Sequence, residues 1–498
     1  MRRLILAALW LSSVFAQQRA PQRPVAPAKP ADHVKSLAGE LKRLVEVFST
    51  VERESAEAPS SDTLFYQGAI PAMLRTLDPH SIFFDPDQFK QLQNMERSEQ
   101  KGFGMIVNVL PGRLMVLQAL PGLPGAKASL GPGDEILAIN NIALSALEFD
   151  QMVELLGYAK QKEALLHIRH AGQSNVEEIT LSPALVDTPS VDRSFLLAPR
   201  VGYLRIAAFE GQTGKLTRQT IEQLGGEYLK ALVIDLRGNP GGDVEAALQT
   251  AALFLSPDQL VFSAAGRNKK REEVRVPLLS APYTFPVAIL MNGKSASASE
   301  IVAGALQDHD RAVILGEVSY GKGLVQQVYP LGANSGLALT TAFYYTPSGR
   351  SIQKPLHGGQ LDPATTVSKG PYKTDAGRLV RGGGGIQPDQ VVLPEATTRL
   401  RTVIDATGYM TVFASEYARN HEIDDNLQIT AAMLDEAKQF LSERSIQPSL
   451  SDWLGHREWL TSRLEQEILN VKFGVARGDV IEMKRDAVVR AALKKMGV

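Results

Sequence analysis

The 498-residue sequence contains no cysteine. This absence excludes a disulfide framework, a thiol nucleophile and metal sites with cysteine ligands. The chain also lacks an excess of charge of either sign, because 53 Lys and Arg residues stand against 54 Asp and Glu residues. Bulk electrostatics therefore favours neither a nucleic acid nor a membrane surface as a partner.

Long apolar runs are lacking as well. Beyond the N-terminus, no run approaches the roughly 18 apolar residues that a membrane-spanning helix needs. The N-terminus itself has Arg2 and Arg3, a short apolar segment over 4–15, and Ala16 at a position suited to cleavage. This pattern is typical of a secretory signal peptide over 1–16, and the alternative is a buried N-terminal helix. We expect an exported protein, tethered if the signal is not cut.

The rest of the chain has the composition of a folded protein, with 44% hydrophobic and 21% charged residues. Its patterns predict a multidomain α+β protein, divided as follows: a flexible linker over 17–32, a helical region over 33–98, a β-rich domain over 99–185, an α/β core with a mixed sheet over 186–395, and a helical region over 396–498. The apolar face of the first helical region is expected to pack on the body of the protein or on a second copy.

Within the core, the apolar segments 287–291, 312–315, 324–329 and 337–344 are expected to complete one mixed sheet. In the C-terminal region, amphipathic spacing predicts helices over 429–442, 453–471 and 480–496. The role of this last region stays open between packing, dimerisation and gating.

Three serines at alternate positions follow the apolar segment 287–291. They are Ser295, Ser297 and Ser299. A strand, a tight turn and a serine at the start of a helix make a geometry that exposes a nucleophile. The alternative is a structural cap, because Ser297 and Glu300 have the spacing of a capping box. In the catalytic reading, the helix dipole and the Ala298 amide lie where an oxyanion would form.

A serine hydroxyl needs a base, and no histidine lies closer than ten residues to these serines. His309 follows Ser297 by twelve residues, at the far end of the same predicted helix, which is too far for a pair. Lys322 lies between two glycines and leads into an apolar strand. Burial would disfavour its charged form, so that it could act as general base. Gln326 is expected on the same face of the strand, hydrogen-bonded to the lysine.

Residues 316–323 come close to a phosphate-binding loop. However, Gly323 stands where Ser or Thr should meet the metal, and a strand rather than a helix follows. Nucleotide binding is therefore not predicted, and the chemistry requires neither a metal nor another cofactor.

Several segments carry a resemblance to one known family. They are NGKSASASEIVAGALQD (292–308), GEVSYGKGLVQ (316–326), LDPHSIFF (77–84), IDLRGNPGGDV (234–244), YYTPSGRSIQ (344–353) and GIQPD (385–389). Taken in their order along the chain, these segments resemble the C-terminal (tail-specific) processing peptidases, which are serine peptidases with a Ser–Lys dyad and a PDZ domain. The resemblance covers about 33–395. The order Gly293-Lys294 departs from the commoner Lys-Gly.

The β-rich domain has a resemblance of its own. KGFGMIV (101–107) followed by LPGLPGAKASLGPGDEILAINN (120–141) resembles a circularly permuted bacterial PDZ domain. In that family the loop formed here by Gly102, Phe103, Gly104 and Met105 offers amides to the carboxylate of a peptide C-terminus, and the peptide adds as a strand. Glycines at these positions free the backbone to turn amides toward an anion, and the alternative is a simple turn.

The resemblance implies site residues and partners. Ser297 would be the nucleophile and Lys322 the base, with Gln326 in support; Glu300 occupies a position that assists in some members. The amide of Ala298 and one from Gly242 or Gly241, with Gly242 favoured, would form the oxyanion hole.

Protein C-termini would be the substrates, in the periplasm or cell envelope of a bacterium. An adaptor or activator protein and a homo-oligomer stay open as partners, and no nucleic acid is expected. The rival reading is a catalytically silent PDZ-containing scaffold.

Two further residues have open roles. Arg237, just before the Gly-Asn-Pro-Gly-Gly turn, would either contact a substrate carboxylate or stabilise the turn through a salt bridge. His80 is expected to hold a turn rather than to do chemistry.

Overall fold

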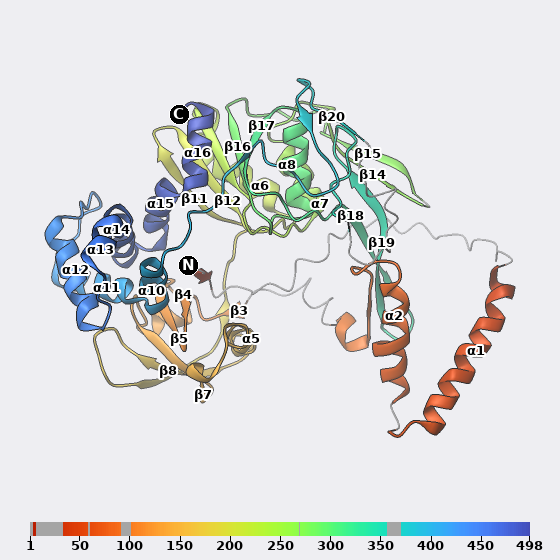
Figure 1. Ribbon diagram of the computed structural model, residues 1–498, viewed down its shortest axis with the longest axis horizontal. Coiled ribbons are helices and arrows are strands. Elements are labelled where there is room, and N and C mark those ends of the chain that lie inside the picture. Colours follow the sequence, from red (N-terminus) through yellow and green to blue (C-terminus); the bar gives the residue numbers. More distant parts are fainter. Residues whose placement is uncertain (1–2, 6–32, 58–59, 91–100, 268, 356–369) are drawn as a thin grey trace.

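The computed structural model describes residues 3–5, 33–57, 60–90, 101–267, 269–355 and 370–498. The predicted linker and all but residues 3–5 of the predicted signal peptide lie outside these residues. Among the described helices, none combines the length and apolar character that a membrane crossing requires. The N-terminal helices lie at one end of the molecule, the α/β core in the middle, and the β-rich part and the C-terminal helices together at the other end (Figure 1).

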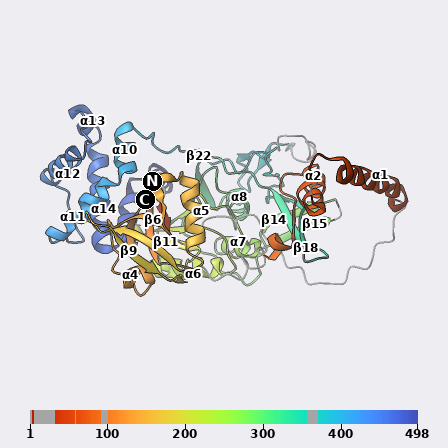
Figure 2. The ribbon, with the colours of Figure 1, turned by 90° about the horizontal axis from the view of Figure 1, so that it is seen from below.

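The N-terminal region holds two helical segments that end beside the core. Its elements are α1 (His33–Glu54), a π-helix (Thr63–Ala69), α2 (Ile70–Arg75) and β2 (Ile82–Phe84). The helical region predicted over 33–98 thus includes π-helical turns over Thr63–Ala69, directly before α2. Helix α1 lies at the outer end of the molecule in both views (Figures 1 and 2). Phe48 on it stacks on Phe65 of the π-helix, whereas Leu41 and Val45 are exposed.

Residues 101–185 form a compact sheet with one long helix, which we call the β-rich unit. Its main sheet has the order β4-β5-β6-β8-β9, and β1 pairs antiparallel with the outer edge of β4. The bounds are β1 (Arg3–Ile5), β3 (Lys101–Gly102), β4 (Met105–Leu110), β5 (Arg113–Ala119), α4 (Pro124–Lys127), β6 (Glu135–Ile139), β7 (Ile142–Ala143), α5 (Phe149–Ala159), β8 (Ala164–Arg169), β9 (Glu177–Leu181) and β10 (Ala184–Leu185). A separate apolar cluster, centred on Val107, Leu114 and Ile168, forms its core.

The core of the protein is a six-stranded sheet in the order β11-β12-β13-β16-β17-β22. The neighbours from β12 onward are parallel, and the inner strands β13, β16 and β17 are buried on both faces and read as continuous apolar runs. Helices α6, α7 and α8 contribute to the apolar cluster on one face, and α16 packs on the other. The bounds are β11 (Val191–Ala198), β12 (Val201–Ile206), α6 (Thr213–Leu224), β13 (Ala231–Asp235), α7 (Val244–Ala251), β16 (Val287–Met291), α8 (Ala298–Asp308), β17 (Ala312–Gly316) and β22 (Gln390–Val391).

The expectation of a single mixed sheet is wrong for its last two strands. β18 (Leu324–Pro330) and β19 (Gly336–Tyr345) belong to a second, antiparallel sheet in the order β15-β14-β19-β18, to which β2 adds. The other members are β14 (Leu260–Gly266) and β15 (Lys269–Arg275). β18 and β19 are joined by a short turn, so they pair with each other as a hairpin, and their half-exposed faces do not need helices on both sides.

The C-terminal region is helical, as predicted, but two of its predicted helices are each divided. Its elements are α10 (Arg399–Thr407), α11 (Tyr409–Asn420), α12 (Ala431–Glu443), α13 (Leu450–Gly455), α14 (Arg457–Phe473), α15 (Val475–Arg485) and α16 (Ala487–Met496). The predicted helix over 480–496 breaks at Asp486, whose side chain accepts the amides of Val488 and Val489 and so caps a new helix. The helix predicted over 453–471 breaks at His456.

Candidate active site

Ser297 lies where the parallel strand β16 has ended and α8 begins. It is the N-cap of α8, with φ of 54° and ψ of −115°, and its side chain is 4% exposed. A serine rarely adopts this conformation, because the Cβ atom crowds the backbone at positive φ. Such backbone strain is typical of functional turns. Residues 292–297 are called the serine turn below.

The strain at Ser297 predicts a measurable difference between two variants that both lack the hydroxyl. We expect Ser297→Gly to unfold at a higher temperature than Ser297→Ala, because glycine adopts positive φ without a Cβ clash. The expected difference in unfolding free energy is about 1–2 kcal/mol, and thermal melts of the two purified variants would measure it. An alanine variant as stable as the glycine variant would show that the turn is not strained.

The hydroxyls of the other two serines donate hydrogen bonds to backbone carbonyls. Ser295 Oγ donates to the carbonyl of Leu236 at 2.8 Å, and Ser299 Oγ donates to the carbonyl of Asn239 at 3.1 Å. Both side chains are fully buried. Residues 238–242 are called the glycine turn below. The two contacts hold the serine turn and the start of α8 against Leu236 and Asn239, where the glycine turn begins. Ser297 is left as the candidate nucleophile among the three.

Glu300 joins the serine turn to residues 319–323, called the lysine loop below. Its Oε2 atom accepts the amide of Ser297 at 2.8 Å and the amide of Lys322 at 2.9 Å. Its Oε1 atom accepts the Ser319 hydroxyl and, at 2.7 Å, the Gly321 amide. The side chain is fully buried, and burial raises the pKa of this carboxyl although the four donors oppose the rise.

One carboxylate oxygen therefore fixes the backbones of both dyad candidates. The sequence identified Glu300 as a cap, but the capping-box spacing carries no signal for its contacts in the lysine loop, about twenty residues further on.

The pKa of Lys322 is lowered. Burial disfavours the ammonium and is the main cause, and the charge of Glu300 partly opposes the shift. The side chain of His80 lies near enough to interact with it, because burial first and the charge of Lys322 second lower the pKa of His80. Lys322 thus has the electrostatic setting of a lysine that can act as a base.

This shift predicts the sign of the pH dependence. Only the neutral amine can accept a proton, so kcat/KM should rise with pH as Lys322 loses its proton. The midpoint should fall below the value of about 10.4 of an ordinary lysine, because the pKa is depressed in the folded protein. Initial rates on a peptide substrate between pH 5 and 10 would measure it; a rate that falls steadily over this range would contradict the assignment.

Gln326 does not make the predicted hydrogen bond to Lys322. Its Nε2 atom donates to the carbonyl of His80 at 2.6 Å, and its buried Oε1 atom has no hydrogen-bond partner among the residues that the structure describes. The carbonyl is presented by a turn in which Asp78 Oδ1 accepts the amides of His80 and Ser81. His80 thus lies in the turn that the sequence predicted, and that turn lies against β18.

The glycine turn lies against Ser297. A Cβ atom placed on Gly241 would come within 2.7 Å of the Ser297 Cβ, and Gly241 has a φ of 104°. The amide of Gly241 donates to Asn239 Oδ1 at 2.8 Å. By contrast, in the part of the chain that the structure describes, the amides of Gly242 and Ala298 have no hydrogen-bond acceptor. Of the two glycines that the sequence left open, Gly242 is therefore the one whose amide can receive an oxyanion.

Arg237 is engaged with carboxylates of the protein itself. Its Nη2 atom lies 2.6 Å from Asp235 Oδ2 and its Nη1 atom 2.8 Å from Asp486 Oδ2. Of its two open roles, the geometry favours the salt bridge that stabilises the turn.

In the β-rich unit, the Gly102–Met105 loop presents its backbone and not its side chains. The side chains of Phe103 and Met105 are 2% and 1% exposed and belong to the core of the unit. The amides of Phe103 and Gly104 have no acceptor among the described residues. Gly104 has a φ of 68°, and a Cβ there would collide with Leu123. The loop therefore has two amides available for an anion at the start of β4.

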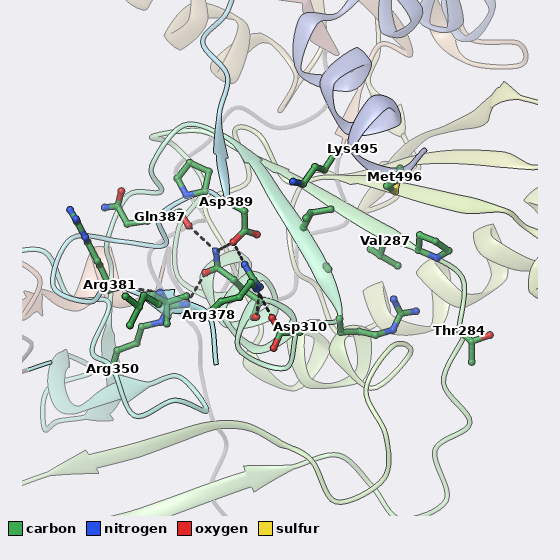
Figure 3. Close-up of a pocket in the computed structure, with 18 residues that line it drawn as sticks. Thr284, Val287, Asp310, Arg350, Arg378, Arg381, Gln387, Asp389, Lys495 and Met496 are labelled. Atoms are coloured by element: carbon green, nitrogen blue, oxygen red, sulfur yellow. Dashed lines mark hydrogen bonds and ion pairs between the residues drawn. The ribbon is translucent and has the colours of Figure 1, made fainter. Parts of the chain in front are cut away.

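The structure also has a cavity of about 1000 Å³, which lies away from this site (Figure 3). It opens at the N-terminal ends of β16 and β17, whereas Ser297 follows the C-terminal end of β16. Its central charges pair internally, since Arg378 contacts both Asp310 and Asp389. Among the described residues, no group of His, Asp and Glu side chains could hold a metal ion.

Comparison with known proteins identifies the family. Residues 200–367 match the model of peptidase family S41. The carboxy-terminal-processing protease of Bartonella bacilliformis is 35% identical over 320 residues, which cover 63% of this chain and 73% of that protein. This chain belongs to the carboxy-terminal processing protease family. It is therefore a serine-type peptidase.

Other members of the carboxy-terminal processing protease family are similarly related. The carboxyl-terminal-processing protease of Synechocystis is 33% identical over 292 residues, covering 57% of this chain and 68% of that protein. The carboxy-terminal processing protease CtpB of Bacillus subtilis is 29% identical over 335 residues, covering 67% and 68%. Among solved structures, the photosystem II D1 C-terminal processing protease matches with 26% identity and a TM-score of 0.40, covering 64% of this chain and 86% of that one.

Proposed function

We propose that this protein is an exported endopeptidase that cleaves the C-terminal region of protein substrates through a Ser297–Lys322 dyad. The observation that carries the proposal is the shared oxygen of Glu300, which binds the amides of both residues and so holds the two backbones together. Specificity for C-terminal regions is supported by the related carboxy-terminal processing proteases and by the loop geometry of the β-rich unit.

The reaction begins when the neutral amine of Lys322 takes the proton of Ser297 Oγ. The oxygen attacks the scissile carbonyl, and the negative charge that develops there is stabilised by the amides of Ala298 and Gly242. The Lys322 ammonium then protonates the leaving amine, which departs and leaves an acyl-enzyme on Ser297. Water, deprotonated by Lys322, attacks the ester, and the second product leaves with the serine restored.

Gln326 supports this dyad indirectly in our proposal. Its side chain binds the His80 carbonyl and so joins β18, which follows Lys322, to the turn that carries the His80 side chain. Burial, and after it the charge of Lys322, lower the pKa of His80, so the imidazole beside the lysine is held neutral.

The β-rich unit is proposed to be a PDZ-like domain that captures the substrate tail. The amides of Phe103 and Gly104 would bind the terminal carboxylate, and the tail would add as a strand to β4. The edge of β4 can accept such a strand, since β1 of the same chain pairs with it in antiparallel register from Ile5↔Ile106 to Arg3↔Asn108. If residues 1–16 are removed on export, this edge becomes available to a substrate.

The experiment compares one peptide substrate with a free C-terminal carboxylate and with a C-terminal amide. The proposal expects cleavage by the wild type, no cleavage by Ser297→Ala, and at least tenfold lower kcat/KM for the amide, because a charge-assisted hydrogen bond is lost. A silent scaffold would bind both peptides and cleave neither. Cleavage of the peptide with the C-terminal amide at the same rate would show that the loop does not capture the substrate tail.

A further inference from the structure

Arg237 connects the glycine turn to the C-terminal helices. It directly precedes Gly238, the first residue of that turn, and it bridges Asp235 at the end of β13 and Asp486 between α15 and α16. Burial opposes the ionisation of Asp235, yet the ion pair and hydrogen bonds from Arg237 lower the pKa of this carboxyl. The guanidinium is therefore held between two charged carboxylates in a largely buried place.

Asp486 is itself fixed from two sides. Its Oδ1 atom accepts the amides of Val488 and Val489, each at 2.9 Å, and so caps α16. Its Oδ2 atom binds Arg237 at 2.8 Å. α16 packs on the face of the central sheet that β13 and β16 present, so the carboxylate cannot move without the helix.

Arg237 joins the start of the glycine turn to the C-terminal helices, whereas the other anchors of this turn lie elsewhere. Gly238 donates its amide to Asn292 Oδ1 at 2.9 Å, and the carbonyl of Asn239 accepts the amide of Ala296 at 3.0 Å, both in the serine turn. The far end of the glycine turn is held by β12 and the segment after it, since the carbonyl of Gly241 accepts the amide of Phe209 at 2.9 Å. A shift of Arg237 would therefore act first on Gly238, at the start of the turn that ends with the Gly242 amide.

The other end of α15 contacts the β-rich unit. The amide of Val475, the first residue of α15, donates to Gln118 Oε1 at 2.9 Å. Gln118 lies on β5 opposite Ile106 of β4, the strand that follows the Gly102–Met105 loop. α15 has 11 residues and hence a length of about 16 Å, so it spans from this contact to Asp486.

We propose that Asp486 is a positioning residue that holds the glycine turn through Arg237, and that α15 makes this positioning depend on the β-rich unit. This gives the C-terminal helices a role in catalysis without any contact with the substrate. The inference rests on the proposed function of the Gly242 amide in the oxyanion hole.

The test uses full-length protein and the peptide with the free carboxylate. Asp486→Asn keeps the helix cap, because asparagine caps as well as aspartate does, but removes the charge that Arg237 binds. We expect kcat to fall about tenfold with KM changed less than twofold, since a displaced oxyanion donor loses part of its effect. Asp486→Glu should recover part of kcat. Asp486→Ser, which also caps, replaces the asparagine variant if that one does not fold.

The matched control is Asp425→Asn. Asp425 pairs with Arg477 on the same helix α15 but not with Arg237, and its loss should leave kcat within twofold of the wild type. A wild-type kcat in Asp486→Asn, or an equal fall in both variants, would overturn the proposal.

A double variant tests the link to the β-rich unit. Gln118→Ala should lower kcat in the same direction as Asp486→Asn, and the two together should lower it no further than Asp486→Asn alone, because both interrupt one connection. Effects that multiply would overturn the link. If Ser297→Ala retains activity, the proposed function fails; if it is inactive while Asp486→Asn is fully active, only the present inference fails.

Discussion

Replacing Ser297 by alanine is expected to lower kcat by roughly four to six orders of magnitude, which is the range for loss of a nucleophile in a serine peptidase. The fold should persist, because the side chain is small and the Ser297 amide, which donates to Glu300, is kept. The measurement is cleavage of a tail-bearing peptide followed by chromatography, with circular dichroism to verify folding.

The matched controls for this loss are Ser295→Ala and Ser299→Ala. Both hydroxyls donate to backbone carbonyls of residues 236 and 239, each of which also accepts a backbone amide, so the removal of either hydroxyl loses one hydrogen bond and should cost about 0.5–1.5 kcal/mol of stability. Each variant should retain catalysis within about one order of magnitude of the wild type. If Ser295→Ala or Ser299→Ala is as inactive as Ser297→Ala, the nucleophile is assigned to the wrong serine.

Replacing Lys322 by methionine is expected to lower kcat by roughly two to four orders of magnitude, the usual contribution of a general base. Methionine preserves the length and apolar stem of lysine and removes only the amine. Kinetics across pH should also lose the rise that the wild type shows, because the site then has no lysine amine whose pKa is lowered.

Stability provides an independent measurement on the same variant. A lysine whose pKa is lower in the folded than in the unfolded state binds protons more weakly when folded, so its charge costs stability below the folded pKa. This cost is relieved as pH rises from the folded pKa toward about 10.4. Lys322→Met should therefore be at least as stable as the wild type at pH 7.

The matched control at this position is Lys322→Arg. The guanidinium keeps the positive charge but does not release its proton in proteins. It should be as inactive as the methionine variant if the neutral amine is the base. Substantial activity in Lys322→Arg would mean that position 322 contributes a charge and not a base.

The local parts of the site could be predicted from the sequence, because their signals lie in short segments. The strand, turn and helix around Ser297 follow from an apolar run, a polar turn and small residues, and the capping-box spacing of Ser297 and Glu300 is local as well. The bonds of Glu300 to the lysine loop could not be predicted, since they depend on how β17 returns beside β16.

Gln326 illustrates the limit more sharply. Alternation along a strand placed it on the face of Lys322, but a register irregularity follows Val325, and its partner is a carbonyl 246 positions away in the N-terminal region. No spacing in the sequence reports a contact of that kind. The single-sheet prediction failed for a related reason, because apolar runs identify strands but not the neighbours with which they pair.

The sequence contains only a weak signal for the division of the last predicted helix at Asp486. This signal is the presence of an aspartate, a residue that caps helices, within an amphipathic pattern. The pattern continues through it, so periodicity favoured one helix over 480–496. Only the packing of α16 on the central sheet, with Arg237 beside Asp486, shows why the chain turns there.

The most direct test of the dyad is to locate a covalent adduct. Full-length protein treated with a fluorophosphonate, which reacts with activated serine hydroxyls, would be digested and analysed by mass spectrometry, alongside Lys322→Met. The account predicts one adduct, on Ser297, in the wild type, and at least a hundredfold slower labelling in Lys322→Met. An adduct on Ser295, Ser299 or another serine, or labelling of Ser297 that does not depend on Lys322, would contradict it.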